Sequence, residues 1–302
     1  MSDVKNYTIG IDLGGTNLRA ALVNETGEII KENEFPTEAE LGPEQGLQKM
    51  VRLIEDIREG YSITGIGVGA PGPLDLFAGL ILDPPNLLKW SNFPLIEGLE
   101  KATGIKVTLD NDAKAAALAE AVYGAGQNYK SVVYITISTG IGAGIVLEGK
   151  VLPGAQGVAG EVGNMILTKE GPMVNNLNQG AWVTLASGSS IEREGKQRLG
   201  IDGGAQEVFQ LVEEGNPEAM QIRDEMITYW AKGIANLVHI INPDIFVLGG
   251  GIMKSEQFFF TQLQTRINDY VYSSLNGKVN VQLAQLGTKS GVIGAALLPS
   301  HS

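Results

Sequence analysis

The 302-residue sequence contains no cysteine, and its two histidines, His239 and His301, lie far apart along the chain. Without cysteine there is no disulfide bond, no thiol nucleophile and no zinc site built from cysteine ligands. Two distant histidines likewise exclude a histidine-rich metal site. A mechanism based on thiol chemistry, or on zinc held by cysteine or several histidines, is therefore ruled out.

The sequence also lacks a long apolar run and an excess of basic residues. It has no stretch of about 18 apolar residues, which a membrane-spanning helix requires, and residues 1–7 are polar, unlike a signal peptide. The 34 acidic residues outnumber the 22 basic ones, which gives a net charge of −12. Nucleic acids and anionic membranes are bound by basic surfaces. We therefore expect a soluble, cytoplasmic protein with no nucleic-acid and no membrane partner.

Glycine, in contrast, is abundant: it accounts for 40 of the 302 residues, about twice its usual share of about 7%. No collagen-like period accompanies it, so the excess belongs in turns and in places where the backbone closely approaches another group. Hydrophobic residues make up 43% of the chain, which is enough for a sizeable core. The length favours two domains.

The apolar patterns alternate between strands and helices. Residues 7–23 and 131–151 share one layout, in which a strand, a glycine-rich turn and a second strand follow one another. Apolar residues at helical spacing predict helices over 44–58 and 218–241, and Asn242-Pro243 ends the second one. Further expected elements are a strand starting within 26–31, a strand running into a Gly/Pro loop at 63–75, a strand and a helix at 105–126, a strand at 244–253, a helix at 256–272 and a short apolar helix at 290–299. Two similar halves predict a mixed α/β protein with two related domains.

The first candidate site is the turn that follows the strand beginning at Tyr7. Gly14 and Gly15 let the backbone N–H groups of the turn approach an anion, and Thr16 and Asn17 add side-chain donors. Asp12, at the end of a buried strand, could orient a hydrated Mg²⁺. An ordinary Gly-Gly hairpin is the alternative explanation. The carboxylate placed two residues before the glycines favours the anion site.

Two more glycine-rich segments suggest the same chemistry. Residues 138–144 place glycines and hydroxyls at a hairpin, although a tight bend between strands would explain them equally well. Residues 249–251 follow a strand and precede a helix, which suits a phosphate or a flat adenine near a helix N-terminus. No Walker A motif and no convincing dinucleotide fingerprint occurs. The residues expected to contact the nucleotide here are Thr139, Gly140, Gly142, Gly249, Gly250 and Gly251.

Three consecutive polar residues, Asp110, Asn111 and Asp112, follow a strand and open a helix. Plain N-capping is the alternative explanation, because Asp and Asn are favoured caps, but one cap residue is enough. A helix N-terminus favours an ionised carboxylate. Such a carboxylate can accept the proton of a hydroxyl that attacks phosphorus.

The spacing of these four segments resembles that of the ROK sugar kinases, which belong to the actin-like ATPase superfamily with hexokinase and the Hsp70 ATPase domain. The motifs that carry the resemblance are IGIDLGGTN (9–17), GVGAPGPLD (67–75), PPNLLKW (84–90), LDNDAKAAALAE (109–120), STGIGAGIV (138–146), GVAGEVGNM (157–165), ASGSSI (186–191) and FVLGGGI (246–252). It implies a two-domain actin-like ATPase (ribonuclease H-like) α/β fold, with duplicated mixed β-sheet domains, flanking helices and a cleft between the domains. The expected domains are residues 1–113 with 290–302 and residues 114–289.

The resemblance also implies roles for individual residues. The turns at 12–17 and 138–144 would hold the phosphates of ATP, residues 249–251 would line the adenosine side, and Asp12 would hold Mg²⁺ through water. Asp112 would be the general base for the sugar hydroxyl. The residues expected to bind the sugar are Gly72, Asn86, Asn111, Asp112, Glu161 and Asn164. For Glu161 the alternative is a surface carboxylate in a glycine-rich loop. A homodimer is also implied.

The chain departs from the family pattern around the expected sugar site. The family usually has a histidine, which contacts sugar and zinc, at Asn164, and a sugar-binding glutamate at Val183. Ser138 stands where glycine is common. Three zinc-binding cysteines of the family correspond to Val174, Asn176 and Ala181. We therefore expect a protein without zinc.

In place of zinc, packing is expected to hold the segment 171–186. The residues expected to pack are Met173, Leu177, Trp182 and Leu185.

These observations predict an ATP-dependent, Mg²⁺-requiring kinase that phosphorylates the 6-hydroxyl of a hexose, with glucose as the favoured sugar. Three alternatives stay open. The sugar could instead be mannose, fructose, glucosamine, N-acetylmannosamine or a β-glucoside. The chain could be a catalytically weak sugar-binding member of the family. It could also be a sugar-responsive repressor, which would need a helix-turn-helix domain of about 60 residues or more before the turn at Asp12.

Overall fold

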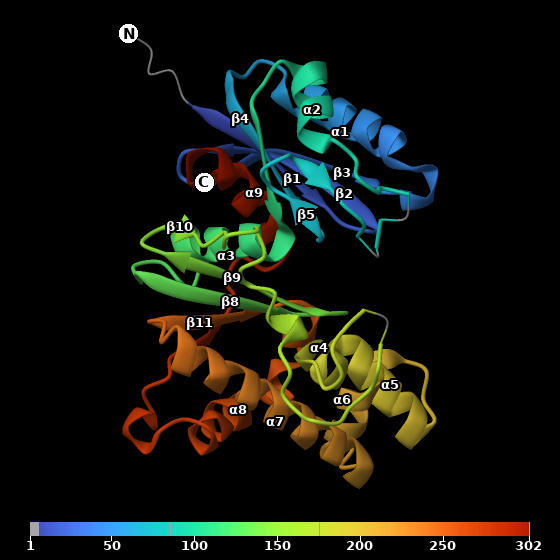
Figure 1. Cartoon of the computed structure of the whole chain (residues 1–302), viewed down its shortest axis with the longest axis vertical. Coiled ribbons are helices and arrows are strands. Elements are labelled where there is room, and N and C mark those ends of the chain that lie inside the picture. Colours follow the sequence, from blue (N-terminus) through green and yellow to red (C-terminus); the bar gives the residue numbers. More distant parts are fainter. Residues whose placement is uncertain (1–5, 85, 88, 175, 302) are drawn as a thin grey trace. The chain divides into compact units, whose positions relative to one another are not determined.

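The computed structural model describes residues 6–84, 86–87, 89–174 and 176–301 (Figure 1). Pro85 and Leu88, which belong to the motif at 84–90, lie outside the described residues. The chain forms two compact units. Unit 1 comprises residues 1–130, 144–159 and 285–302, and unit 2 comprises residues 131–143 and 160–284. No helix among the described residues is long and apolar enough to cross a membrane.

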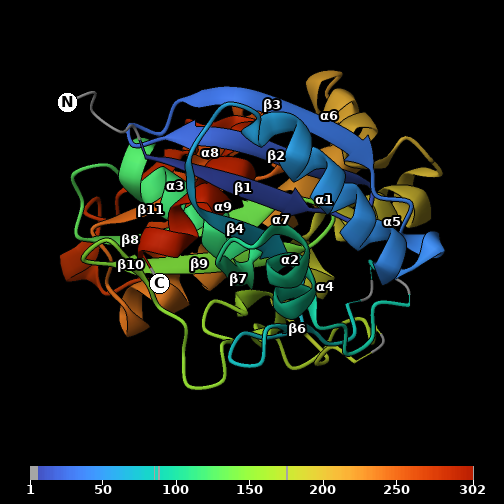
Figure 2. The ribbon, with the colours of Figure 1, turned by 90° about the horizontal axis from the view of Figure 1, so that it is seen from above.

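Unit 1 contains a five-stranded sheet. Its strands, in spatial order, are β3 (Ile29–Pro36), β2 (Asn17–Asn24), β1 (Tyr7–Leu13), β4 (Ile63–Ala70) and β7 (Val107–Asn111) (Figure 2). β2 runs antiparallel to both of its neighbours, β3 and β1, whereas β4 and β7 run parallel to β1. Leu13 pairs with Leu18 at the end of the β1–β2 hairpin. The predicted strand, glycine turn and strand over 7–23 is confirmed.

The two faces of this sheet differ because glycine alternates with branched residues along β1 and β4. Ile9 and Ile11 are fully buried in the core that α1 (Pro43–Arg58) and α2 (Leu95–Thr103) complete. The other face carries α9 (Ser290–His301) and α3 (Asp112–Tyr123). A Cβ atom at Gly10 would overlap the carbonyl of Val292 in α9. Part of the glycine excess is thus explained by helices that lie directly on the sheet.

Unit 2 is built around the parallel strands β8 (Ser131–Ile137), β11 (Ile245–Gly249) and β12 (Val281–Leu283). The sheet has the order β10-β9-β8-β11-β12. β9 (Ile141–Leu147) follows β8 after a short turn and pairs antiparallel with β10 (Lys150–Val151). In both sheets a hairpin is thus followed by parallel strands. The prediction of a mixed α/β protein with two related sheets is confirmed.

The helices of unit 2 follow the sequence less closely. They are α4 (Trp182–Ala186), α5 (Gly188–Leu199), α6 (Gly204–Glu213), α7 (Pro217–Ile240) and α8 (Phe260–Arg266). The prediction for α7 is confirmed, and the Asn216 side chain caps it by accepting hydrogen bonds from two backbone N–H groups. α2, α4, α5 and α6 were not predicted. The remaining elements are β5 (Leu74–Asp75), β6 (Leu80–Ile81) and six short 3₁₀ helices at 39–41, 162–164, 251–258, 267–269, 273–275 and 287–289.

The prediction of a single helix over 256–272 is wrong. The chain leaves helical geometry at Phe259, whose φ is −145°, between a 3₁₀ helix (Gly251–Phe258) and α8. Phe259 is 1% exposed, and its ring centroid lies 4.8 Å from that of Trp230 and 5.8 Å from that of Phe209. Burial of this aromatic ring therefore prevails over a continuous helix.

The compact units place the whole of α3 in unit 1, whereas the predicted domain boundary falls between residues 113 and 114. The division into domains 1–113 with 290–302 and 114–289 stays a prediction.

Candidate functional site

The turn between β1 and β2 is a tight turn with close neighbours. The N–H of Gly14 donates to the Asn17 carbonyl (2.9 Å), and the Thr37 hydroxyl donates to the Gly14 carbonyl (2.7 Å). A Cβ atom at Gly15 would lie 2.9 Å from the carbonyl oxygen of Asn86. The structure therefore gives a reason for glycine at position 15 that the sequence did not indicate. Its lack of a side chain lets the segment with Asn86, a predicted sugar contact, lie against the turn.

The Asp12 carboxylate lies beside the first turn of α9. A Cβ atom at Gly291 would be 2.6 Å from Asp12 Oδ2. Burial raises the pKa of Asp12, and the positive charge of Arg19, which pairs with Asp12 across β1 and β2, partly opposes this rise. The described residues contain no group of three or more Asp, Glu or His that could hold a metal. A hard oxygen donor suits Mg²⁺, which commonly keeps several waters and binds substrate phosphates. The role of Asp12 as a ligand of hydrated Mg²⁺ stays a prediction.

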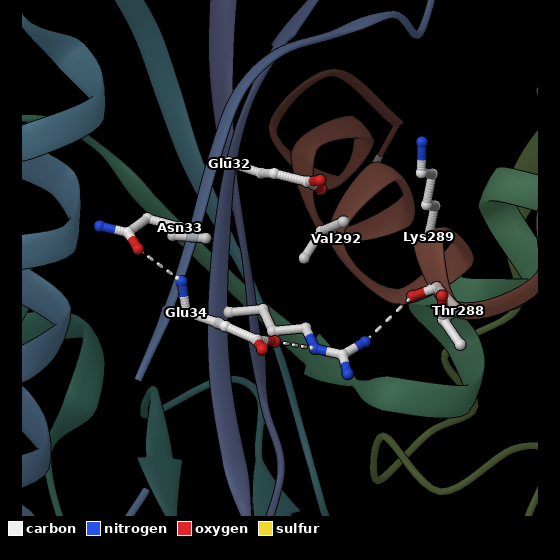
Figure 3. Close-up of a pocket in the computed structure, with 8 residues that line it drawn as sticks. Glu32, Asn33, Glu34, Thr288, Lys289 and Val292 are labelled. Atoms are coloured by element: carbon white, nitrogen blue, oxygen red, sulfur yellow. Dashed lines mark hydrogen bonds and ion pairs between the residues drawn. The ribbon is translucent and has the colours of Figure 1, made fainter. Parts of the chain in front are cut away.

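Arg19 also borders a cavity of about 430 Å³ in unit 1 (Figure 3). Its Nε lies 3.0 Å from Glu34 Oε2, and its Nη1 donates to the carbonyl of Thr288 at 3.5 Å. Glu32 and Lys289 complete the charged lining. Among the described residues, those that line this cavity include none of the predicted site residues. The cavity therefore does not coincide with the candidate site.

The turn that opens α3 satisfies its own backbone. Asn111 is the N-cap, and its Oδ1 accepts from the N–H groups of Ala113 (2.9 Å) and Lys114 (3.4 Å). Asp112 Oδ1 also accepts from Ala113 N–H (2.7 Å), and Asp110 Oδ1 accepts from Asn111 N–H (2.7 Å). Asp112 is exposed. Capping is thus real at Asn111, while Asp112 presents a fixed, accessible carboxylate.

Two glycines let neighbouring strands approach the start of α3. A Cβ atom at Gly69 would lie 3.5 Å from Asp112 Cα, and one at Gly144 would lie 2.8 Å from Lys114 Cα. The sequence analysis included Gly144 only as part of the segment 138–144, and it gave no role to Gly69, nor to the buried Lys114 and Glu120. The two charged residues could have been noticed, because they stand within an otherwise alanine-rich helix.

The buried Glu120 connects α3 to the segment before α9. Its carboxylate accepts hydrogen bonds from the N–H groups of Ala125 (3.0 Å), Gln285 (3.1 Å) and Leu286 (2.8 Å). Charge-assisted hydrogen bonds of this kind compensate for the burial of a carboxylate. Glu120 therefore has a structural role in unit 1.

In unit 2 the structure brings the two glycine-rich segments together. The N–H of Gly188, at the start of α5, donates to the Ser138 carbonyl (2.7 Å), and the N–H of Ser189 donates to the Thr139 carbonyl (3.3 Å). A Cβ atom at Gly251 would lie 3.5 Å from Ser138 Oγ. The start of α5 and Gly251 therefore lie against the turn at 138–140.

Gly249 and Gly250 have steric reasons to be glycine. A Cβ atom at Gly249 would overlap the Tyr134 side chain, and Gly250 has a φ of +92°. Beside Gly251 lies a cavity of about 570 Å³, whose lining includes Phe209, Phe258 and Lys254. Aromatic walls next to a glycine segment can accommodate a flat base. The contact of residues 249–251 with adenosine stays a prediction.

The loop with Glu161 is attached to the start of β9. The Gly160 carbonyl accepts from the N–H of Ala143 (3.1 Å), and the Glu161 side chain is exposed. Asn164 is hydrogen-bonded to Asn178. Its side-chain Oδ1 accepts from the N–H of Asn178 (2.8 Å), and its backbone carbonyl accepts from Asn178 Nδ2 (3.3 Å). Asn164 therefore braces this loop, and its predicted sugar contact stays a prediction.

The expected packing of the segment 171–186 is partly wrong. Trp182 and Leu185 are buried, but Met173 is 72% exposed and Leu177 is only half-buried. Backbone hydrogen bonds hold the segment instead, from Leu167 N–H to the Gly180 carbonyl (2.8 Å) and from Trp182 N–H to the Met165 carbonyl (2.8 Å). Because small exposed loops bury little apolar surface, backbone hydrogen bonds contribute more to the stability of this segment than side-chain packing does.

Val183 lies beside the turn at 138–140. A Cβ atom at Gly140 would be 3.9 Å from Val183 Cγ2, and one at Gly163 would be 3.4 Å from Val183 Cβ. An apolar side chain therefore occupies the position at which the family resemblance implies a polar sugar contact.

Each unit contains part of the predicted site. Unit 1 contains Asp12, Gly14, Gly15, Thr16, Asn17, Gly72, Asn86, Asn111 and Asp112, and unit 2 contains Thr139, Gly140, Gly142, Glu161, Asn164, Gly249, Gly250 and Gly251. Gly72 is half-buried in the loop after β4 and precedes a cis proline, Pro73.

Comparisons with known proteins agree with this organisation. The sequence pattern of the ROK family matches residues 8–301. A glucokinase from Thermotoga maritima is 34% identical over 302 residues, which cover 95% of each chain. The crystal structure of a ROK hexokinase from Thermus thermophilus has a TM-score of 0.90 and 34% identity, and covers 97% of each chain. A ROK family glucokinase from Streptomyces griseus, in complex with glucose and AMPPNP, has a TM-score of 0.81 and 30% identity over 96% of this chain and 98% of that one.

Proposed function

Because the chain belongs to the ROK family and is an ATP-dependent sugar kinase, we propose that it phosphorylates the 6-hydroxyl of a hexose, with glucose as its preferred substrate. The observation that carries the proposal is the placement of Asp112. Its carboxylate is exposed at the N-terminus of α3, directly after the capping Asn111, and one oxygen is fixed by the N–H of Ala113.

In the proposed reaction Asp112 accepts the proton of the 6-hydroxyl as that oxygen attacks the γ-phosphorus of ATP. The bond between the γ-phosphorus and the bridging oxygen breaks, and ADP is released with the sugar 6-phosphate. Phosphoryl transfer depends mainly on positioning and on stabilisation of charge. Mg²⁺, when bound beside Asp12, would neutralise charge on the phosphate oxygens.

Five residues besides Asp112 are proposed to bind the sugar. Asn111 has an amide Nδ2 left for a sugar hydroxyl, because its Oδ1 is occupied by the helix cap. The exposed Glu161 offers a carboxylate acceptor, and Gly72, Asn86 and Asn164 complete the proposed contacts. The turn at 138–140 and the glycines at 249–251 are proposed to bind the nucleotide.

The second candidate function is phosphorylation of another hexose, and the apolar side chain of Val183 favours this possibility. A site that hydrogen-bonds a hydroxyl strongly rejects an analogue without it, whereas an apolar side chain cannot do so. Val183 leaves one side of the sugar without a polar contact, so we expect a broad choice of hexoses or a high KM for glucose. We also propose that the protein is a homodimer located in the cytoplasm.

A coupled assay of ADP release tests the proposal, with glucose, mannose, fructose, glucosamine and a β-glucoside as acceptors and with Mg²⁺ present or removed by chelation. We expect turnover of glucose that requires Mg²⁺, and kcat/KM values for other hexoses within about 10⁴ of that for glucose. A preference above about 10⁴ would require a full set of polar contacts and would contradict the reasoning on Val183. Absence of turnover with every hexose would refute the proposed function.

A further inference from the structure

A buried lysine in α3 joins the turn that carries Asp112 to the loop that precedes Glu161. Lys114 is 2% exposed. Its Nζ lies 2.6 Å from the carbonyl oxygen of Gly157, 3.4 Å from that of Pro153 and 3.5 Å from Asp110 Oδ1. A lysine ammonium has three N–H donors, so these three acceptors match its full capacity.

Burial of this charge pair needs a reason. The side chains of Lys114 and Asp110 are 3% and 9% exposed, and removing such charges from water is costly unless they are paired. The neighbouring positions of α3 are filled by small apolar residues such as Ala115 and Ala117, both 0% exposed. An apolar residue at position 114 would avoid the cost of burying charge, but it could not bind two backbone carbonyls at once.

The acceptors on the far side belong to one compact loop, residues 153–159. Gly154 and Gly157 adopt positive φ values of 76° and 77°, and the N–H of Ala159 donates to the Pro153 carbonyl (3.1 Å). The loop thereby turns its carbonyl groups toward Lys114. Glu161 follows Ala159 by two residues, and the intervening Gly160 is held by its carbonyl, which accepts from the N–H of Ala143 (3.1 Å).

The acceptor on the near side belongs to the turn with Asp112. Asp110 accepts from the N–H of Asn111, whose side chain in turn caps the helix. A single ammonium therefore joins the segment that carries the proposed base to the segment that leads to a proposed sugar contact.

We propose that Lys114 is a positioning residue for the sugar: its ammonium fixes the loop 153–159 to the Asp110–Asp112 turn, and so constrains the chain that leads into Glu161. The expected effect on the kinetics rests on the proposed function. The expected dependence of the loop 153–159 on the Lys114 ammonium does not rest on it.

The test uses the full-length double variant Asp110→Asn/Lys114→Met. It removes both charges together and so avoids leaving an unpaired buried carboxylate, which can prevent folding. Lys150→Met is the matched control, because it removes an exposed lysine on the strand just before the loop. Two readouts are taken: hydrogen–deuterium exchange of segment 154–161, and steady-state kinetics with sugar and ATP varied separately.

We expect the double variant to exchange faster in segment 154–161 while β1 and β4 keep wild-type protection. We also expect kcat/KM for the sugar to fall about 10- to 100-fold, mainly through a higher KM for the sugar, with the KM for ATP within about twofold of wild type. Wild-type exchange in the loop would overturn the inference. So would equal changes in both KM values, because they would indicate general destabilisation.

The two proposals fail separately. If the wild-type protein phosphorylates no hexose, the proposed function falls, and the exchange experiment still decides whether Lys114 holds the loop.

Discussion

Replacement of Asp112 by asparagine separates the chemistry of this residue from its structural contribution. The Asn side chain keeps a carbonyl oxygen that can accept from the N–H of Ala113, as Asp112 Oδ1 does at 2.7 Å. Asn111 remains the N-cap. Since Asp and Asn are about equally good near a helix N-terminus, we expect the free energy of unfolding to change by less than about 1 kcal/mol.

The effect on catalysis should be much larger. A positioned general base contributes about 10²- to 10⁴-fold to the rate, which corresponds to about 3–5 kcal/mol of barrier at about 1.4 kcal/mol per tenfold. An amide cannot take the proton of the 6-hydroxyl, so kcat should fall by this factor. The affinity for the sugar should change little.

The assay combines kcat from coupled kinetics with sugar affinity from calorimetry. Asp244→Asn is a suitable control. It makes the same chemical change at a carboxylate that accepts from the N–H and the hydroxyl of Ser131, both at 2.8 Å. Ser131 starts β8, whereas the turn at 138–140 follows the end of that strand. A kcat for Asp112→Asn within about threefold of wild type, with chemistry rate-limiting, would refute the assignment.

Four further outcomes are expected. The substitution Gly291→Ala places a Cβ atom 2.6 Å from Asp12 Oδ2. The value of kcat/KM for MgATP should therefore fall about tenfold or more, while the sugar affinity measured by calorimetry stays constant. A weakened sugar affinity with normal ATP kinetics would contradict this expectation. Burial raises the pKa of Asp12 in the native state above the unperturbed value of 3.8. Between these two pKa values the native state keeps a proton that the unfolded state has released, so the stability of the protein falls as the pH rises through this range. The Asp12→Asn variant should therefore have a higher Tm than wild type at neutral pH, and the difference in Tm should shrink as the pH is lowered toward 3.8. Asn164→Ala removes the hydrogen bond from the N–H of Asn178, which should cost about 1 kcal/mol and lower Tm by about 2–4 °C in a thermal melt. Chelator-treated protein should contain no stoichiometric zinc by elemental analysis and should keep its activity once Mg²⁺ is restored, because Val174, Asn176 and Ala181 replace the cysteine ligands.

The sequence alone determined the architecture, because local patterns specify local structure. The strand, glycine turn and strand layout at 7–23 and the strand entering a Gly/Pro loop at 63–75 were predicted from the sequence, and the repeated layout predicted two related halves. The N-cap of α3, Asn111, lies within the polar triplet for which the sequence offered capping, whereas the N-cap of α7, Asn216, was not predicted. The prediction of one helix over 256–272 was wrong because the helical spacing of its apolar residues competes with the burial of Phe259 against Trp230. This contact joins distant parts of the chain.

The candidate site was predictable only where chemistry is local. A carboxylate beside a cap, or a glycine pair after a strand, can be recognised from neighbours in the sequence. Met173 was expected to pack and is exposed, because apolar character does not reveal whether a partner lies opposite.

The tertiary structure decided what distant residues do for one another. It placed the Asn86 backbone against Gly15, the Asp12 carboxylate against Gly291, and the Lys114 ammonium among Asp110, Pro153 and Gly157. No sequence period encodes such contacts, because they depend on which surfaces meet when the strands and helices pack. A lysine in an alanine-rich helix looks like a solvated charge until the fold buries it with three acceptors.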